Sequence, residues 1–108
     1  MLVKHIVMFR LKAEATDSDH EKICKALLAL PDACGVSCLA YECGTDLQLP
    51  SGQNHPLGPN RHIVWSLTLA SIDDYNTYNT SDAHVAFLAL LKPLLEPGSR
   101  AAIQYKIP

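Results

Sequence analysis

Residues 61–69 read Arg-His-Ile-Val-Trp-Ser-Leu-Thr-Leu, a run rich in β-branched and aromatic side chains that predicts a β-strand. Side chains alternate between the two faces of a strand, so His62, Val64 and the later even-numbered residues share one face. Ile63, Trp65 and the later odd-numbered residues share the other. An antiparallel sheet with one solvated face alternates apolar with polar residues, and neither face of this strand is strongly polar. We therefore expect a sheet that is covered on both faces.

The flanking sequence predicts three more strands and two helical regions. Strands are expected at residues 2–11, 36–43 and 101–107, in addition to 61–69, and helices at residues 18–30, 72–80 and 81–95. Ser18 and Glu21 have the spacing of a capping box that begins the first helix, and Pro31 is expected to end it. Pro93 is expected to bend the last helix, and Pro97 with the glycine after it to end it.

The resulting order of elements is β-α-β-β-α-β, in which the second helix is split in two. This order is typical of the ferredoxin-like α+β fold, an antiparallel four-stranded sheet with helices on one face. The 108 residues suffice for one core and therefore for a single domain, residues 1–108. Residues 45–60 contain three prolines and two glycines and predict a long loop, which is either a lid over a pocket or a surface insertion.

Composition excludes several classes of protein. Hydrophobic residues make up 48% of the chain and charged residues 19%, which is typical of a compact globular protein. A formal net charge of -2 gives no electrostatic reason to expect a nucleic acid or an anionic membrane as partner. No apolar run approaches the ~20 residues that span a bilayer, and Lys4, His5 and Arg10 interrupt the apolar start of the chain. We expect a soluble cytoplasmic protein without a signal peptide.

The four cysteines do not have the spacing of a metal site or of a disulfide framework. Three residues separate Cys34 from Cys38 and four separate Cys38 from Cys43, and there is no CxxC pair. Cys24 lies in the helical pattern of residues 18–30. In a cytosolic chain we expect all four to be free thiols on small, buried side chains.

Coverage of both sheet faces has a consequence for assembly. The helices of this fold cover one face only, so the other face must meet a second structure. A second copy of the same sheet is the simplest partner. We predict a homodimer that pairs through the face carrying Trp65.

His84 lies in the sequence Ser-Asp-Ala-His-Val-Ala-Phe-Leu-Ala-Leu-Leu of residues 81–91. Apolar residues follow it by three, four and seven positions, which places the imidazole on the buried stripe of an amphipathic helix. Ser81 is a suitable N-cap three residues earlier, so His84 is expected in the first turn. The positive end of the helix dipole disfavours imidazolium there, and a neutral ring suits either a general base or a hydrogen-bonded core residue.

Two histidines of the strands are expected near His84. If His5 and His62 face the helices, three of the five histidines converge beside Tyr78, with Tyr41 close to them. Two alternatives stay open: each ring bonds a backbone carbonyl or a hydroxyl, or the three rings bind zinc, although no carboxylate shares their face. Apolar side chains are expected to form the wall of the pocket, namely Val7, Phe9, Val64, Phe87 and Leu91.

Three stretches carry a family resemblance. Residues 3–12 read Val-Lys-His-Ile-Val-Met-Phe-Arg-Leu-Lys, and residues 61–64 read Arg-His-Ile-Val. Tyr78 is followed by Ala-His-Val-Ala-Phe at residues 83–87 and by Lys-Pro-Leu at residues 92–94. These stretches resemble the first strand, the third strand and the Tyr-x-x-His-Pro-x-His-Val signature of the stress-responsive A/B barrel (Dabb) domains. The resemblance covers nearly the whole chain and implies a dimeric α+β barrel.

The resemblance also implies an activity. The best understood reaction in the family is that of a plant polyketide cyclase, which closes a linear poly-β-keto thioester by an intramolecular aldol condensation without metal or organic cofactor. By resemblance, His84 is the general base and Tyr78 binds the substrate carbonyl, while His5, His62 and Val64 line the pocket. A polyketide-like small molecule is the expected substrate, and neither a cofactor nor a metal is expected.

Three residues depart from the family pattern. Ser81 and Asp82 stand where the signature has His-Pro, and Gln104 stands where an acidic residue orients the base. A glutamine still holds the ring but stabilises imidazolium less than a carboxylate does. Two other functions stay open: a non-catalytic stress-responsive dimer in which His84 is structural, and a cofactor-independent monooxygenase, since related dimeric α+β barrels oxidise aromatic polyketides.

Overall fold

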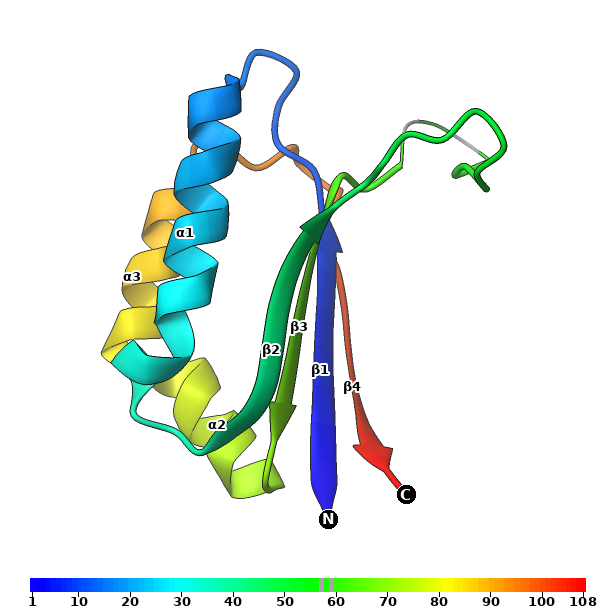
Figure 1. Cartoon of the computed structure of the whole chain (residues 1–108). Coiled ribbons are helices and arrows are strands. Elements are labelled where there is room, and N and C mark those ends of the chain that lie inside the picture. The colour runs from blue at the N-terminus through cyan, green and yellow to red at the C-terminus, as the bar shows by residue number, and fades with distance from the viewer. Residues whose placement is uncertain (57, 59) are drawn as a thin grey trace.

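The computed structural model describes residues 1–56, 58 and 60–108; Leu57 and Pro59 of the expected loop lie outside the described residues. Figure 1 shows a sheet with the helices packed against one of its faces. The elements follow in the order β1 (Leu2–Phe9), α1 (Asp17–Cys34), β2 (Cys38–Thr45), β3 (Ile63–Leu69), α2 (Ile72–Thr80), α3 (Asp82–Leu91) and β4 (Ala101–Ile107). This order confirms the ferredoxin-like α+β fold with a split second helix.

The sheet has the strand order β2-β3-β1-β4, and every neighbouring pair is antiparallel. His5 of β1 pairs with Leu67 of β3 on one side and with Gln104 of β4 on the other. Val7 of β1 pairs with Trp65 of β3. Residues that pair directly in an antiparallel sheet share a face, and so do residues two apart on one strand. All five side chains therefore lie on the same face.

The hydrophobic core fills the space between this face and the helices. It consists of buried side chains from the sheet, the helices and the segment after β1, namely Phe9, Leu11, Ile23, Leu27, Leu30, Ile63, Trp65, Leu67, Leu69, Tyr78, Phe87 and Leu91. Trp65 is 1% exposed, and its indole Nε1 donates a hydrogen bond to the hydroxyl of Tyr78 at 3.0 Å. Burial of each large apolar side chain stabilises the fold by about 1.5–3 kcal/mol. The helices therefore stabilise the fold most by covering the face of β3 that carries its odd-numbered side chains.

The expectation that Trp65 faces a partner chain is therefore wrong, because its side chain lies beneath the helices. The opposite face carries Met8 paired with Val64, and the helices leave that face uncovered. Met8 is 42% exposed there, Tyr105 46% and Ile103 58%. Alternation along a strand distinguishes two faces but does not identify the one that the helices cover. That choice depends on which set of side chains packs against α1 and α3.

The first helix begins earlier and ends later than its sequence pattern predicts. Thr16, rather than Ser18, is the N-cap: its hydroxyl accepts from the Asp19 N–H at 3.1 Å, and the Asp19 carboxylate accepts from the Thr16 N–H at 2.9 Å. The helix continues through the buried Pro31, and Gly35 ends it with a φ of 69°. A proline near the end of a helix removes one hydrogen bond, and here burial of its ring in the core offsets that loss.

The second helical region divides at Ser81, as the sequence predicts. Ser81 is the C-cap of α2, and because its hydroxyl accepts from the N–H of His84 at 3.2 Å it is also the N-cap of α3. His84 thus lies in the first turn of α3. The helix ends at Leu91 rather than at Leu95, which instead forms an isolated β-bridge with Leu11.

The structure also bears on the cysteines and on membrane spanning. All four cysteines are free thiols, and the sulfurs of Cys24 on α1 and Cys43 on β2 lie 3.2 Å apart.

No helix in the described part of the chain is long and apolar enough to cross a membrane.

Candidate functional site

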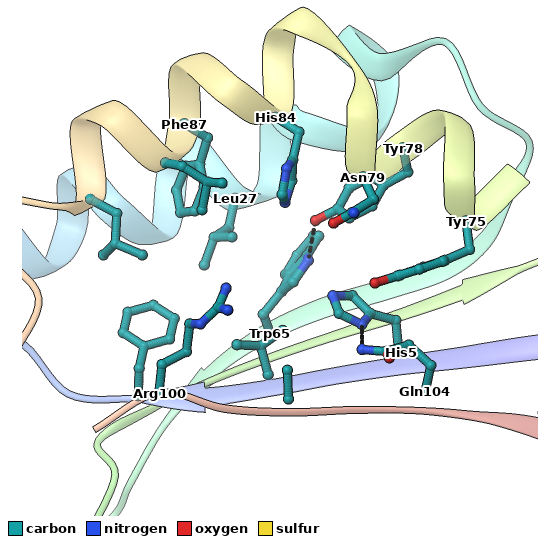
Figure 2. Close-up of a pocket in the computed structure, with 15 residues that line it drawn as sticks. His5, Leu27, Trp65, Tyr75, Tyr78, Asn79, His84, Phe87, Arg100 and Gln104 are labelled. Atoms are coloured by element: carbon teal, nitrogen blue, oxygen red, sulfur yellow. Dashed lines mark hydrogen bonds between the residues drawn. The ribbon is translucent and has the colours of Figure 1, made fainter. Parts of the chain in front are cut away.

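A cavity of about 350 Å³ lies between the sheet and the helices, at the lower end of the size range of small-molecule sites. Figure 2 shows side chains of β1, β3 and β4 on one side of it and side chains of the helices on the other. Its polar lining comes from His5, Tyr75, Tyr78, Asn79, His84, Arg100 and Gln104. Its apolar lining includes Val7, Phe9, Leu27, Trp65, Phe87 and Leu91.

His84 projects from the first turn of α3 into this cavity (Figure 2). The residue is 9% exposed, and its buried Nδ1 has no hydrogen-bond partner among the described residues. Burial lowers the pKa of His84; the backbone of Asn79 opposes this shift, and the charge of Arg100 adds to it. The ring is therefore neutral near pH 7.

Tyr78 of α2 lies next to His84, with 4.9 Å between the ring centroids. Because the indole N–H of Trp65 donates to the Tyr78 hydroxyl oxygen, the phenolic proton is left to be donated elsewhere. Burial raises the pKa of Tyr78 to about 12, so the hydroxyl stays protonated at neutral pH. His84 and Tyr78 therefore form a pair of one proton acceptor and one proton donor.

His5 has a different environment from His84. Nε2 of Gln104 lies 2.9 Å from Nδ1 of His5, and because an amide NH₂ only donates, Nδ1 accepts and the ring proton is on Nε2. Burial, the neighbouring His84 and the charge of Arg100 lower the pKa of His5 to about 4. His5 is thus a neutral hydrogen-bond donor. Gln104 orients His5 and not His84, contrary to the expectation from the sequence, because β4 places it opposite His5.

The structure brings most of the predicted site residues together around the cavity. Those that line it are His5, Val7, Phe9, Tyr78, His84, Phe87 and Leu91. They come from β1, α2 and α3, which are far apart in the chain but adjoin in the fold (Figure 2).

Three of the predicted site residues lie outside the cavity. His62 contacts His20 near the start of α1, with 5.2 Å between the ring centroids. Val64 lies on the uncovered face of the sheet, and Tyr41 lies on the edge strand β2, where it is 42% exposed. His62 precedes the first residue of β3, and its ring lies against His20 of α1, so it does not join His5 at the cavity. The expectation of three converging histidines is therefore wrong.

The positions of the histidines also bear on the alternative of a three-histidine zinc site. Within residues 1–56, 58 and 60–108, no group of three or more His, Cys, Asp or Glu is placed to hold a metal ion. His5 and His84 share the cavity and His62 does not, so the described residues do not assemble a three-histidine site.

Three polar residues of the lining were not predicted from the sequence: Tyr75, Asn79 and Arg100. Tyr75 lies one turn before Tyr78 on α2, and its ring centroid is 5.2 Å from that of His5. The spacing of the two tyrosines, three residues apart, is a signal of a shared helix face. Arg100 has no comparable signal, because its place depends on how the chain returns from α3 to β4.

The fold and the cavity define an α+β protein of ferredoxin-like architecture with a site between the sheet and the helices. The sequence pattern of the stress responsive A/B barrel domain (Dabb) matches residues 3–107, and the chain belongs to this family. No curated protein matches the chain.

Several solved structures share the fold. A dimeric ferredoxin-like protein of unknown function from Thermobifida fusca is 29% identical, with a TM-score of 0.79 and coverage of 99% of this chain and 92% of that one. The hydroxynitrile lyase of Passiflora edulis is 21% identical, with a TM-score of 0.82 and coverage of 99% and 94%. A protein from Arabidopsis thaliana is 21% identical, with a TM-score of 0.79 and coverage of 98% and 95%. The similarity to the two plant proteins is one of fold.

Proposed function

We propose that this protein is a cofactor-free enzyme of the lyase class that catalyses the intramolecular aldol-type cyclisation of a linear poly-β-keto substrate. His84 is the general base, and Tyr78 donates a hydrogen bond to the substrate carbonyl. The observation that carries the proposal is the buried Nδ1 of His84, which has no hydrogen-bond partner among the described residues, in a side chain that lines the cavity next to the ring of Tyr78. A buried histidine with a purely structural role normally has its ring nitrogens hydrogen-bonded.

The reaction follows from the chemistry of these two groups. Neutral His84 removes a proton from a carbon between two carbonyls, and the enolate carbon then attacks a more distant carbonyl of the same chain. Tyr78 donates to the oxygen on which negative charge develops. The imidazolium of His84 returns its proton to the new alkoxide, so no external reactant is consumed. General base catalysis of this kind contributes roughly 10²–10⁴-fold to the rate.

His84 is assigned as the base in preference to His5. The pKa of His5 is lowered to about 4, and Gln104 already occupies its Nδ1. A group with so low a pKa is a weak base at neutral pH, whereas its Nε2–H is suited to donate to an oxyanion. The site thus contains one base, His84, and two donors, Tyr78 and His5.

The apolar lining supports the choice of substrate. A flexible poly-β-keto chain must fold so that two distant carbons meet, and a shaped cavity supplies that arrangement before reaction. Side chains of β1 and α3 provide the wall: Val7, Phe9, Phe87 and Leu91. The Passiflora edulis relative is named as a lyase, which agrees with the proposed class.

We also propose a homodimer that forms through the uncovered face of the sheet. In a single chain that face exposes Met8, Ile103 and Tyr105. Large apolar side chains exposed together on one sheet face mark an interaction surface, and a second copy covers them most economically. The Thermobifida fusca relative is dimeric. The proposed interface is on the side of the sheet opposite Trp65, and the two sheets face one another as in an α+β barrel.

The test compares two histidine variants in their turnover of a tetraketide-CoA and a pentaketide-CoA. His84→Gln is expected to lower turnover by about 10²-fold or more, because it removes the base, while Tm stays close to that of the wild type. His62→Gln is the matched control, since His62 lies outside the cavity, and it is expected to keep full turnover.

Other outcomes point to the two alternative functions. A wild type that turns over neither substrate, together with a His84→Gln variant that changes only stability, excludes the cyclase and favours a non-catalytic stress-responsive dimer. Consumption of O₂ with an aromatic polyketide identifies a cofactor-independent monooxygenase instead.

A further inference from the structure

Arg100 is the charged member of the cavity lining. The described lining contains no Lys, Asp or Glu, and both of its histidines are neutral. Figure 2 shows the guanidinium extending from the sheet into the cavity, in the direction of α3. No hydrogen bond or ion pair joins this guanidinium to another described residue. A cation without an acidic partner therefore faces the site.

The backbone that carries Arg100 is held in place by its neighbours. Ser99 is 1% exposed, and its hydroxyl donates to the Glu96 carbonyl at 2.7 Å. The carbonyl of Ser99 accepts from Nε of Arg61 at 2.7 Å. On the other side β4 begins at Ala101. Because the backbone is fixed before a ligand arrives, less ordering cost opposes binding by Arg100.

The other polar groups at the cavity complement an anion. The His5 Nε2–H and the Tyr78 hydroxyl are donors, and both keep their protons at neutral pH. The guanidinium offers parallel N–H groups that match a carboxylate in a bidentate arrangement. One cation surrounded by neutral donors suits a singly charged carboxylate better than a doubly charged phosphate.

We propose that the cavity takes a substrate with a free carboxylate, and that Arg100 binds this group and thereby determines specificity. The inference rests on the proposed function for the nature of the reacting chain, and it narrows that chain to a poly-β-keto acid. A carboxylate bound by Arg100 holds one end of the substrate at the residue that precedes β4. The keto groups then extend past His84 and Tyr78, which line the same cavity.

The experiment uses the fluorescence of Trp65, which is the one tryptophan of the chain and lines the cavity. The probes are 3-phenylpropanoate, the neutral 3-phenylpropanamide and inorganic phosphate. The wild type is expected to bind the propanoate about tenfold or more tightly than the amide, the size of effect typical of hydrogen bonds to charged groups. Arg100→Gln is expected to abolish this preference, and Arg100→Lys to keep part of it, since lysine retains the charge but not the planar fork.

Lys106→Gln is the matched control, because it removes the same charge from β4 at a residue that does not line the cavity. It is expected to keep the preference for the propanoate, and thermal melting shows that each variant is folded. A preference that persists in Arg100→Gln overturns the inference. So does a wild type that binds the two organic probes equally, binds neither, or binds phosphate more tightly than the propanoate.

Binding of these probes does not depend on turnover, so the inference and the proposed function fail separately. If the protein binds carboxylates preferentially through Arg100 but cyclises no polyketide, the inference is supported and the proposed function is contradicted. A protein in which Arg100→Gln leaves both the rate and the KM for cyclisation of a free poly-β-keto acid unchanged keeps the proposed function and overturns the inference.

Discussion

His84 is buried at a cost to stability. Leaving a polar atom buried without a hydrogen bond costs on the order of 1–3 kcal/mol, and Nδ1 of His84 is such an atom. Packing of the neighbouring Phe87 and Tyr78 offsets part of this cost. The residue that lowers stability in this way also lines the cavity, which is the trade-off common at functional sites.

Tyr78 is expected to matter for both turnover and stability. Tyr78→Phe removes a donor to the oxyanion and is expected to lower turnover by about 10²–10³-fold. It also leaves the buried indole N–H of Trp65 without its acceptor, which is expected to destabilise the fold by about 1–3 kcal/mol. Turnover assays and urea unfolding measure the two effects. Tyr41→Phe is the control, and equal behaviour of the two variants would rule out the donor role.

His5 is expected to make stability depend on pH. Its pKa is lowered from 6.5 to about 4 in the folded chain, so between these values the unfolded chain binds a proton that the folded chain does not. Stability rises with pH wherever the unfolded state binds more protons, so it is highest above about pH 6.5 and is lost progressively as the pH falls to about 4. The lowered pKa of His84 acts in the same direction.

Urea unfolding across this pH range tests the dependence. His5→Asn is expected to flatten the curve, because the titrating group is gone. His62→Asn, whose ring lies outside the cavity, serves as the control. A His5→Asn curve as steep as that of the wild type would show that other groups cause the slope.

The junction of α2 and α3 explains one departure from the family signature. Ser81 stands where the signature has histidine, and in this chain its hydroxyl accepts from the N–H of His84 and donates to the carbonyl of Tyr78 at 2.9 Å. It therefore links the backbones of the two candidate catalytic residues. Asp82 follows in the first turn of α3, where a negative charge is favoured by the helix dipole.

Replacement of this cap is expected to affect the site as well as the helix. Ser81→Ala removes the N-cap of α3 and is expected to cost about 0.5–2 kcal/mol in unfolding free energy. Because His84 lies in the capped turn, turnover is expected to fall too. Thr16→Ala, which removes the cap of α1, is the matched control: a similar loss of stability with unchanged turnover is expected. A Ser81→Ala variant with wild-type turnover would show that the helix cap does not affect catalysis at the site.

The sheet as a unit has one face under the helices and one apolar face without cover. Ile103 of the edge strand β4 pairs with Ile6 on the uncovered face and is 58% exposed. Ile103→Lys is expected to convert the proposed dimer to a monomer, because it places a charge in an apolar interface. Light scattering after size-exclusion chromatography measures the mass. Leu28→Lys, at a 44% exposed position of α1, is expected to leave the dimer intact; a dimer in both variants would place the interface elsewhere.

Patterns within single elements predicted much of the fold and part of the site. The helical spacing after His84 predicted a ring that faces the interior, and the position of Ser81 predicted the break between α2 and α3. Both depend only on residues within one or two turns. The end of α1 was not predicted, because Pro31 is tolerated there by packing in the core.

The order of elements, the ferredoxin-like arrangement and the apolar character of both sheet faces follow from the chain's own spacing, because periodicity sets how side chains point relative to their neighbours on one element. Contacts between distant segments settled the rest: Trp65 lies beneath the helices, His62 is outside the cavity, Gln104 pairs with His5, and Arg100 enters the site. Alternation is symmetric between two faces, so it contains no information about which face another element will cover. That symmetry is broken when side chains far apart in the sequence are buried together.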